Sequence, residues 1–569
     1  MSVERKTATT VLLKRSDKDE GGWRLQTFGD SAEGEYICAK TDGDGGEDLA
    51  LFKYFKMELF RGGREGKGGR KVDDVMGIAA DNRVTLPLVY VVSLALKHIK
   101  AQIIDRLNSS DQGTLRSSDI RFVLTIPAIW SEFGKIFMRT AAFRGGLIDS
   151  EHDQENLALC LEPEAACLSV EQDNAHPWEQ GTQVMILDCG GGTIDVTTHE
   201  VIGASPLELK EVEEPTGGPW GSTVVDSKFK AFLKDILRCS KEAWNKLSGS
   251  AQMLSLMRDW ESKKTDYQEG QSVRLQLGDI LDQIEMNVIT FKVSVEDFNS
   301  TVVGVLMGSR LKATGRTLKI EPALMSSFFD DVFNEIVRVS REVLDKNPGI
   351  SMVYLVGGFS SSPLLQKAVT RGLKNGHGAV RVIAPRRPGL AIVLGAALFG
   401  ANKGSIISRK ARLTYGTAGV SRYNAADPEH SKRESQTKSY EGKIYLDKFY
   451  KYVERGQDLP VGTEKEHTFS PVTEGQQSMR FEVLVTKQCA ADVQYVKDRG
   501  VNRMLNNLVT VDVPMDMTAS FTRRDVSMRF SFGGSELGIK CRRHSDGKEV
   551  RVNTIYVEDI EDTSYGRTV

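Results

Sequence analysis

The spacing of apolar residues predicts a helix followed by a buried strand in the first third of the chain. In LPLVYVVSLALKHIKAQIIDRL (86–107) apolar residues recur at helical spacing. The run IRFVLTIPAIW (120–130) is largely apolar and contains β-branched residues, which is typical of a strand covered on both faces. A helix that leads into a buried strand indicates an α/β domain.

The same order of elements returns later in the chain. Residues 326–344 have the pattern of an amphipathic helix, and residues 351–369 have that of a buried strand, a glycine-rich turn and another helix. The repetition predicts two related α/β halves. Residues 222–302 are mainly helical in pattern and finish with strand-like segments. They predict a smaller subdomain inserted into the second half.

The texture of the chain changes after about residue 403. Short strand-like segments such as SMRFEVLVTK and NLVTVDVPM alternate with turn residues, which predicts a separate all-β unit of sandwich type. A chain of 569 residues is too long for one core. The predicted organisation is therefore an α/β fold in two halves, 1–182 and 183–402, followed by a β-rich domain, 403–569.

Composition and charge argue against several classes of function. The 75 basic and 77 acidic residues leave a net charge of -2, so no basic excess favours nucleic acid as a partner. Seven cysteines, never spaced as CxxC, argue against a disulfide framework or a zinc site. The longest apolar stretch falls short of the about 20 residues that span a bilayer, and the N-terminus has no signal-peptide core. We expect a soluble, cytoplasmic protein.

The segment MILDCGGGTIDV (185–196) carries the first candidate chemistry, because it places three glycines between two aspartates after a buried strand. Glycine lets backbone amides approach a phosphate closely, since no Cβ holds the chain away. Asp188 and Asp195 could order the water ligands of Mg²⁺ or an attacking water. The alternative is a hairpin turn whose glycines only supply positive φ.

A second glycine turn, YLVGGFSSSP (354–363), follows a buried strand and precedes a helix. Ligands of α/β folds bind at the carboxyl ends of such strands. Two turns of this kind, in equivalent places of the two halves, predict one nucleotide site.

Three more segments extend this pattern: VLTIPAIWSEFGKIFMRTAAFRGGL (123–147), LEPEAACL (161–168) and EEPTGGPWGSTVVDSKF (213–229). With the glycine turns they resemble the superfamily of actin, sugar kinases and heat-shock 70 kDa ATPases. FKYFKMELF (52–60) and RLTYGTAGV (412–420) make the chain similar to the divergent heat shock 70 kDa protein 12 subfamily. The resemblance implies an actin-like duplicated ATPase fold that uses ATP or ADP with Mg²⁺.

The resemblance also implies roles for individual residues. The catalytic carboxylates would be Asp188, Asp195 and Glu162, the first two positioning Mg²⁺ through water. The nucleotide contacts would be Gly190, Gly191, Gly192, Thr193, Gly217, Gly218, Glu261, Lys264, Gly357, Gly358 and Ser361. Pro127 and Lys135 match a relay between the nucleotide and the β-rich domain. For Glu162 the alternative is a helix-start carboxylate, and for Glu261 and Lys264 it is an ordinary surface ion pair.

Several positions depart from the family pattern. The first phosphate loop, an aspartate followed by Gly-Thr-Thr, has no counterpart before Leu86, which we interpret as a missing opening hairpin. Lys53 or Lys56 would then supply the catalytic lysine. Ser361 stands where the family has an arginine over adenine, and Gly389 stands where it has an acidic residue. Both changes predict a weaker grip on the nucleotide.

The C-terminal part departs as well. The linker KGSIISRKARLTYG (403–416) is basic rather than acidic and apolar, which predicts weakened coupling between the nucleotide and the β-rich domain. Neither a helical lid nor a Glu-Glu-Val-Asp ending follows in the sequence.

Two functions follow as hypotheses. The first is an ATP-binding, chaperone-like protein of the stress response with weak or absent Mg²⁺-dependent hydrolysis, whose β-rich domain binds protein clients or signalling partners. The second is an interaction scaffold that keeps the fold without turnover, which the missing loop favours. A sugar kinase fits less well, because the β-rich domain and EPEAA resemble the chaperone branch.

Overall fold

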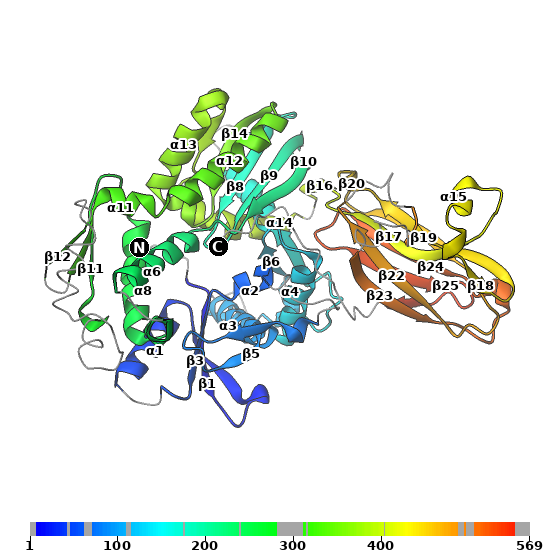
Figure 1. The fold of residues 1–569 in the computed structure, drawn as a ribbon, viewed down its shortest axis with the longest axis horizontal. Coiled ribbons are helices and arrows are strands. Elements are labelled where there is room, and N and C mark those ends of the chain that lie inside the picture. Colours follow the sequence, from blue (N-terminus) through cyan, green and yellow to red (C-terminus); the bar gives the residue numbers. More distant parts are fainter. Residues whose placement is uncertain are drawn as a thin grey trace.

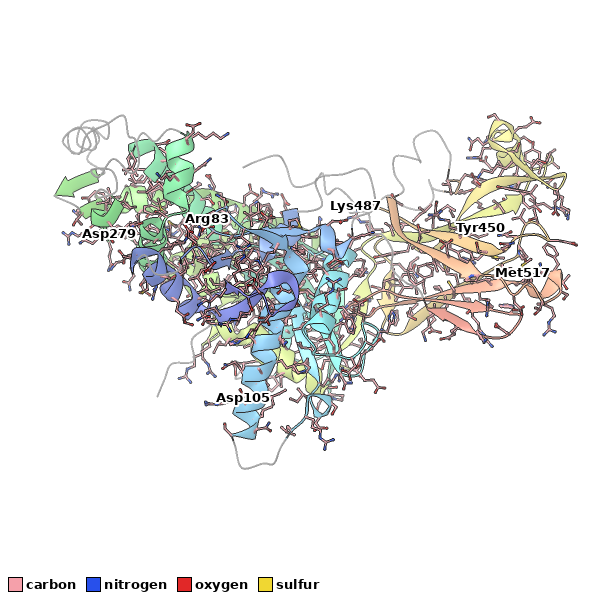
Figure 2. The ribbon with its side chains drawn as sticks, turned by 90° about the horizontal axis from the view of Figure 1, so that it is seen from below. Arg83, Asp105, Asp279, Tyr450, Lys487 and Met517 are labelled. Atoms are coloured by element: carbon pink, nitrogen blue, oxygen red, sulfur yellow. The ribbon has the colours of Figure 1, made fainter. Side chains whose placement is uncertain are left out.

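The structure, a computed structural model, describes residues 7–42, 46–61, 71–109, 115–173, 177–237, 241–280, 311–314, 317–402, 404–487, 494–496 and 506–551. The chain forms an α/β lobe and a β-rich lobe, and strands β16 and β20 lie where the two meet (Figure 1). Tyr450 and Met517 lie in the β-rich lobe, and Asp279 lies at the far end of the α/β lobe (Figure 2). No helix of the described residues is long and apolar enough to cross a membrane.

The chain opens with a small antiparallel sheet that the sequence pattern did not predict. Its strands pair in the order β2-β1-β3. The elements of this region are β1 (Thr10–Arg15), β2 (Trp23–Phe28), α1 (Asp30–Asp42), β3 (Leu49–Lys53), α2 (Lys56–Arg61), β4 (Met76–Ile78) and β5 (Thr85–Pro87). Leu254 of the second half is buried among Leu12, Tyr36 and Leu51 of this region. The small sheet therefore closes against the second half.

The first α/β half confirms the predicted helix and strand. Its elements are α3 (Leu88–Asn108), β6 (Phe122–Ile126), α4 (Glu132–Arg144), β7 (Leu157–Leu161) and α5 (Glu162–Gln172). The end of α3 that carries Asp105 projects from the lobe (Figure 2). Strand β6 pairs in parallel with β7, and among the described strands it has no second partner. Both faces of β6 are nevertheless packed, because Phe122, Leu124 and Ile126 belong to one hydrophobic cluster and Val123 packs against another, while the three middle residues stay partly exposed.

The second half is built on a sheet in the order β15-β14-β8-β9-β10-β16-β20. Its elements are β8 (Gln183–Cys189), β9 (Ile194–Ala204), β10 (Leu207–Gly218), α12 (Asp330–Lys346), β14 (Ile350–Val356), α13 (Pro363–His377), β15 (Arg381–Ile383) and α14 (Ala391–Ala401). The order strand, helix, parallel strand, helix is the same in β6-α4-β7-α5 and β14-α13-β15-α14. The predicted likeness of the halves is therefore visible in their topology.

Helices and a small sheet extend the second half. They are α6 (Thr223–Ile236), α7 (Lys241–Ser248), α8 (Ala251–Thr265), β11 (Val273–Gln276), β12 (Leu311–Thr314), β13 (Thr317–Ile320) and α11 (Pro322–Ser327). The stacked rings of Phe229 and Trp260, 3.9 Å apart, join α6 to α8. The strand-like end of the predicted insertion, from residue 281 on, lies outside the described residues.

Two short strands beyond residue 403 belong to the sheet of the second half. Strand β16 (Ile406–Lys410) pairs in parallel with β10, and β20 (Asp458–Pro460) pairs with β16. The basic linker is thus docked as a sheet strand.

The β-rich lobe consists of two antiparallel sheets in the orders β18-β19-β17-β22-β23 and β21-β24-β25-β26. Its elements are β17 (Thr414–Arg422), α15 (Pro428–Ser431), β18 (Lys438–Tyr440), β19 (Lys443–Val453), β21 (Thr463–Phe469), β22 (Ser478–Thr486), β23 (Asn506–Pro514), β24 (Val526–Phe532), β25 (Gly538–Arg543) and β26 (Glu549–Arg551). Rings from both sheets meet, with Tyr452 and Phe530 at 4.2 Å. The predicted segments SMRFEVLVTK and NLVTVDVPM form β22 and β23, and the last predicted strand, EVRVNTIYVED (549–559), lies mostly outside the described residues.

Candidate functional site

The glycine turn joins two antiparallel strands and places its two aspartates opposite each other. Asp188 of β8 pairs with Asp195 of β9, and both are almost fully buried. None of the three glycines between them adopts positive φ. The interpretation that they only supply positive φ is therefore wrong.

The carbonyl groups of the turn are all directed toward the start of α6. Backbone amides of residues 221–223 donate to them: Gly221 to Gly192 at 3.2 Å, Ser222 to Gly190 at 3.2 Å and Thr223 to Gly191 at 2.9 Å. In a trans peptide the N–H points opposite to the preceding C=O. The amides of Gly191, Gly192 and Thr193 consequently face away from α6, on one side of the turn. Successive amides on one side form an anion-binding concavity.

Space is available beside this turn. Among the described residues, a Cβ added to Gly191 would meet no atom within 4 Å, whereas one on Gly192 would lie 2.2 Å from Met57 Sδ. Met57 thus packs α2 of the first half directly on the turn. Gly191 has no neighbour in the protein that requires a glycine, which is expected where a ligand approaches.

Packing of α2 brings a lysine to the carboxylates. Lys56 Nζ lies 2.5 Å from Glu162 Oε1, and the Lys56 side chain remains 44% exposed while that of Glu162 is 12% exposed. Burial opposes the charge, but Glu162, Asp188 and Asp195 hold the pKa of Lys56 above its usual value. Lys56 also lies 5.7 Å from the ring centre of Trp130. Of the two lysines left open by the sequence, Lys56 reaches the site and Lys53 pairs with Glu33 instead.

Asp195 is a buried carboxylate whose two oxygens have different surroundings. Its Oδ1 accepts a hydrogen bond from the backbone N–H of Ile129 at 3.0 Å, and its buried Oδ2 has no hydrogen-bond partner within the part of the chain that the structure describes. Burial, reinforced by the charge of Glu162, raises the pKa of Asp195 to about 6. A carboxyl in this state suits proton transfer at neutral pH.

Glu162 begins α5 directly after β7, with Pro163 in the first turn. This placement agrees with the alternative of a helix-start carboxylate, since negative charge is favoured at a helix N-terminus. The ion pair with Lys56 also ties the same carboxylate to α2, whose Met57 packs on the glycine turn.

The remaining glycines lie at strand ends around the aspartates. Gly217 of β10 pairs with Asp195 and has φ of +149°, and a Cβ there would lie 2.0 Å from Ile194 O. Gly218 lies against the Trp220 ring. Gly357 follows β14 with φ of +87°, and its Cβ would meet Asp188 Oδ1 at 2.3 Å. Both positive-φ glycines are therefore required by the fold, whatever else they contact.

The second turn continues from Gly357 into a short helical turn. Gly358 precedes this turn, which spans Phe359–Ser361. A Cβ on Gly389 would lie 3.8 Å from Gly358 Cα and 4.0 Å from Ser361 Oγ. The two positions that depart from the family pattern, Ser361 and Gly389, therefore lie side by side.

Lys264 of α8 is buried and pairs with Asp226 of α6 and with Glu261, whose own side chain is exposed. Lys264 Nζ lies 2.5 Å from Glu261 and 2.8 Å from Asp226, and its side chain is only 3% exposed. It also donates to Ser222 O at 3.5 Å, and Ser222 N bonds the glycine turn. On the Lys264 side the alternative of an ordinary surface pair is wrong, because the ammonium is buried between α6 and α8.

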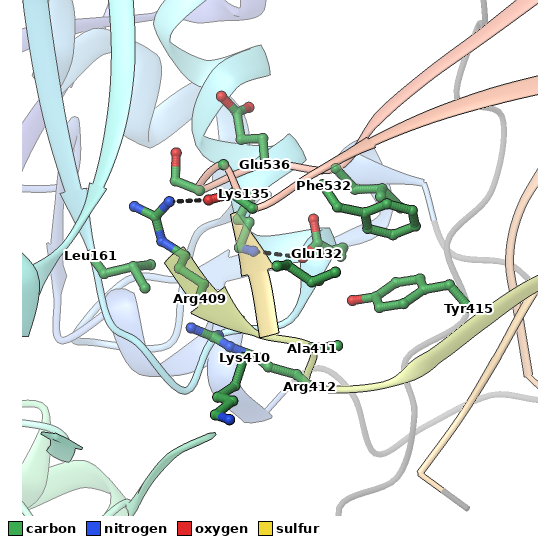
Figure 3. A pocket seen from close by; sticks show the side chains of 15 residues that line it. Glu132, Lys135, Leu161, Arg409, Lys410, Ala411, Arg412, Tyr415, Phe532 and Glu536 are labelled. Carbon is green, nitrogen blue, oxygen red and sulfur yellow. Dashed lines mark hydrogen bonds and ion pairs between the residues drawn. The ribbon is translucent and has the colours of Figure 1, made fainter. Parts of the chain in front are cut away.

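Pro127 lies near Asp195, and Lys135 lines a pocket at the junction of the lobes (Figure 3). Pro127 follows β6, two residues before the amide that holds Asp195. Lys135 of α4 is buried and bonds Glu132 at 2.5 Å. Burial lowers the pKa of Lys135.

Sequence reasoning missed Trp130, Met57 and Asp226. Trp130 stands inside the quoted IPAIW segment, so an aromatic residue after the proline was the available signal. Met57 and Asp226 act through packing between distant segments, for which the sequence carries no local signal.

The amides of the turn, Lys56 and the carboxylates are groups that suit a nucleotide whose cation contacts the protein through its water ligands. Among the described residues no group of three or more His, Cys, Asp or Glu side chains could hold a metal directly. The unpartnered, buried Oδ2 of Asp195 is an acceptor that a hydrated cation could satisfy. Asp188, Asp195 and Glu162 would be the residues nearest to such a cation.

Comparison with known proteins gives relatives along nearly the whole chain, although no protein-family model matches it. The chain is 26% identical to heat shock 70 kDa protein 12A of Homo sapiens, over 96% of this chain and 85% of that protein. It is 25% identical to heat shock 70 kDa protein 12B of Homo sapiens, over 98% and 86% respectively. It is also 26% identical to chaperone protein DnaK 3 of a Synechococcus species, over 28% of this chain and 22% of that protein.

Proposed function

We propose that this chain, which is a relative of the heat shock 70 kDa proteins of the protein 12 type, binds ATP or ADP with Mg²⁺ at the β8–β9 turn and acts as an ATP-binding, chaperone-like protein. The observation that carries the proposal is the turn itself. Three backbone amides face away from α6, and there is free space beside Gly191. Lys56 and three carboxylates lie near the turn.

Each group has a role that follows from its surroundings. The amides of Gly191, Gly192 and Thr193 would hold phosphate oxygens, and Lys56 would add positive charge where charge develops on the transferred phosphoryl group. Bound Mg²⁺ would neutralise phosphate charge and order water near Asp188, Asp195 and Glu162. Asp195, with a pKa of about 6, would accept a proton from the attacking water.

We expect this site to hydrolyse ATP slowly. Among the described residues the sheet of the first half contains β6 and β7 alone, so the phosphates would be held mainly from the second half and by Lys56. Catalysis of phosphoryl transfer depends on positioning and charge from all sides. The scaffold without turnover therefore remains the second candidate, and it is supported by the same observation.

The β-rich lobe would supply the partner surface in either case. We propose that it binds protein clients or signalling partners, because a docked linker joins it to the nucleotide-binding lobe. Nucleic acid is not among the proposed partners, and we propose the cytoplasm as the location.

Calorimetric titration with MgATP, with MgADP and with ATP in EDTA tests nucleotide binding directly. We expect metal-dependent heat from the unaltered protein. Gly191→Ala and Asp188→Asn should weaken binding by about tenfold or more, since a hydrogen bond to a charged group contributes about 1.5–3 kcal/mol. Gly191→Ala should leave the melting temperature unchanged, because its Cβ meets no protein atom within 4 Å.

Gly475→Ala is the matched control, since a Cβ there is also free of neighbours within 4 Å and the residue lies in the β-rich lobe. It should bind nucleotide as the unaltered protein does. A folded protein that gives no heat and no thermal shift with any nucleotide would reject nucleotide binding and leave the scaffold.

A further inference from the structure

The first turn of α6 carries Asp226, a buried carboxylate that has no role in the proposed binding of phosphate. Its Oδ1 accepts hydrogen bonds from Trp260 Nε1 and from Lys264 Nζ, each at 2.8 Å. Both donors belong to α8, and residues four positions apart lie on one face of a helix. The three residues are at most 5% exposed. Asp226 therefore fixes the rotation of α6 relative to α8.

Aromatic rings surround this pair of bonds. Phe229, which follows Asp226 on α6, stacks on the Trp260 ring at 3.9 Å, and the Phe328 ring meets Trp260 edge-on at 5.8 Å. A hydrogen bond is stronger in such surroundings than in water, and a buried carboxylate without its donors is unfavourable. The rings therefore disfavour any other position of the Asp226 side chain.

The ammonium group of Lys264 is occupied by protein acceptors. It lies 2.8 Å from Asp226 and 2.5 Å from Glu261, and it donates to Ser222 O at 3.5 Å. An ammonium has three N–H donors, and here three acceptors face them. Lys264 can thus influence a bound phosphate through Asp226 and Ser222, without contacting the ligand.

The start of α6 in turn holds the glycine turn. The amides that donate to the turn carbonyls belong to Gly221, Ser222 and Thr223, shortly before Asp226. The two segments approach closely, since a Cβ on Gly221 would lie 2.3 Å from Gly191 O. Because each turn amide points opposite to the preceding carbonyl, a rotation of the α6 start would also turn the amides that face away from α6.

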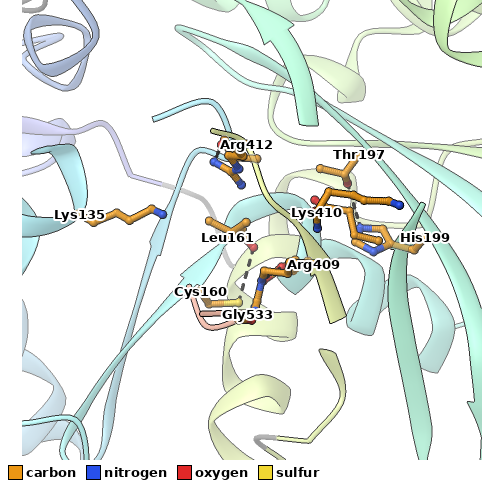
Figure 4. A network of polar contacts seen from close by, with 12 residues as sticks. Lys135, Cys160, Leu161, Thr197, His199, Arg409, Lys410, Arg412 and Gly533 are labelled. Atoms are coloured by element: carbon orange, nitrogen blue, oxygen red, sulfur yellow. Dashed lines mark hydrogen bonds and ion pairs between the residues drawn. The ribbon is translucent and has the colours of Figure 1, made fainter. Parts of the chain in front are cut away.

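Another buried polar network lies under the linker, around Arg409 (Figure 4). In it, His199 and Thr197 of β9 bond each other at 3.0 Å. None of the residues labelled in Figure 4 belongs to the glycine turn, to α6 or to α8. The bonds of Asp226 thus hold the α6 start independently of those labelled residues.

We propose that Asp226 is a positioning residue for phosphate at the β8–β9 turn. Trp260 and Lys264 fix Asp226, Asp226 fixes the start of α6, and the α6 start orients the turn so that its amides face the ligand. The link from Asp226 to the turn is a property of the protein alone. Its effect on phosphate rests on the proposed nucleotide binding.

Hydrogen exchange of the full chain without ligand, followed by mass spectrometry, tests the link from Asp226 to the turn. Asp226→Asn keeps an acceptor for Trp260 and removes the charge that holds Lys264. It should accelerate exchange of the amides at 221–223 by about tenfold, since a hydrogen bond to a charged group is lost, while β8 keeps its protection. Lys264→Met should do the same, and the double variant should add little, because both residues act through one bond.

Asp235→Asn is the matched control, because Asp235 is an exposed aspartate on the same helix. It should leave exchange at 221–223 unchanged. Equal exchange in Asp226→Asn and Asp235→Asn would overturn the link. Faster exchange throughout β8 and α8 as well, in both Asp226→Asn and Lys264→Met, would overturn it in favour of a general contribution to stability.

Calorimetric titration with MgATP and with the magnesium complex of 2′,3′-dideoxy-ATP tests the effect on phosphate. The dideoxy compound lacks both ribose hydroxyls and keeps all three phosphates. Asp226→Asn and Lys264→Met should weaken binding of both compounds by the same factor, about tenfold, which is the lower end of the loss on removing a residue that orients a metal ligand. Asp235→Asn should bind both compounds as the unaltered protein does.

A loss of affinity for MgATP that is clearly smaller for the dideoxy compound would overturn the positioning role, since Lys264 would then act on the ribose directly. Unchanged affinity in a variant with faster exchange at 221–223 would overturn the effect on phosphate and leave the link. An unaltered protein that binds MgATP but not the dideoxy compound would also overturn that effect, because its affinity would depend on the ribose. No binding of MgATP by the unaltered protein would reject the proposed function together with this effect, and the exchange measurements would still decide the link.

Discussion

Gly395→Ala should destabilise the α/β lobe by about 3 kcal/mol or more, the upper end of the usual cost of overpacking. Helices α5 and α14 cross at this residue, and a Cβ on Gly395 would lie 1.5 Å from Ala165 O and 3.0 Å from Ala165 Cα. The obstacle is backbone, which no side-chain rotation can move away. Because α5 carries Glu162 and Glu164, separation of the helices would also disturb the ion pairs of Glu162 with Lys56 and of Glu164 with Arg409.

Destabilisation by Gly395→Ala would specifically indicate the close approach of α5 and α14. In a helix, replacing glycine by alanine ordinarily stabilises by about 0.5–1 kcal/mol. Thermal and urea unfolding, followed by circular dichroism, would measure the change. Gly404→Ala, just after α14, is the control, since its Cβ would make only an ordinary contact at 3.6 Å with Asn402 Oδ1. An unchanged or higher melting temperature for Gly395→Ala would contradict the close crossing.

The parts of the fold that the sequence predicted are those with a strong local period. The helix around residues 88–108 and the strands β8 and β14 carry continuous or periodic apolar patterns. The opening sheet β2-β1-β3 was missed because its strands are short and lie between glycine-rich, charged stretches. The docking of β16 was missed because IISRK becomes a sheet strand only through β10 and the buried Glu164.

In the candidate site, too, contacts within one local segment could be predicted from the sequence, and contacts between distant segments could not. Asp188 and Asp195 flank one turn, so their meeting across a hairpin follows from the sequence. Lys56 and Glu162 are 106 residues apart, and their pairing depends on how α2 packs against the turn. The burial of Lys264 depends on Asp226, which lies on another helix. Nucleotide contact by these residues stays a prediction.

Glu211 should make the stability of the protein fall as pH rises from about 4.5 to about 7. This residue of β10 is buried beneath the linker, where its Oε2 accepts the Lys410 N–H at 2.7 Å and its Oε1 has no hydrogen-bond partner. Burial raises the pKa of Glu211 to about 7, against the attraction of Arg412 and Arg409, while the charge of Glu164 raises it further. In this pH range the folded protein keeps a proton that the unfolded chain has lost.

Unfolding then releases that proton, and the free energy of unfolding decreases with pH. The difference between the two pKa values corresponds to about 3 kcal/mol, present in full below pH 4.5 and lost above pH 7. His199, paired with Glu211 across β9 and β10, acts in the opposite direction, since burial lowers its pKa to about 4. The pH dependences that Glu211 and His199 give to the free energy of unfolding partly cancel. Unfolding of the unaltered protein alone would therefore not reveal the contribution of either residue.

The contribution of Glu211 appears in the comparison with Glu211→Gln, which keeps an acceptor for Lys410 but cannot titrate. Urea unfolding at pH 4.5 and pH 7.5 should show the unaltered protein losing about 3 kcal/mol relative to the variant as pH rises. Glu208→Gln, near the start of the same strand, is the control and should show no such difference. A pH-independent difference between the unaltered protein and Glu211→Gln would mean that Glu211 stays ionised, and that water or a cation reaches its Oε1 beneath the linker.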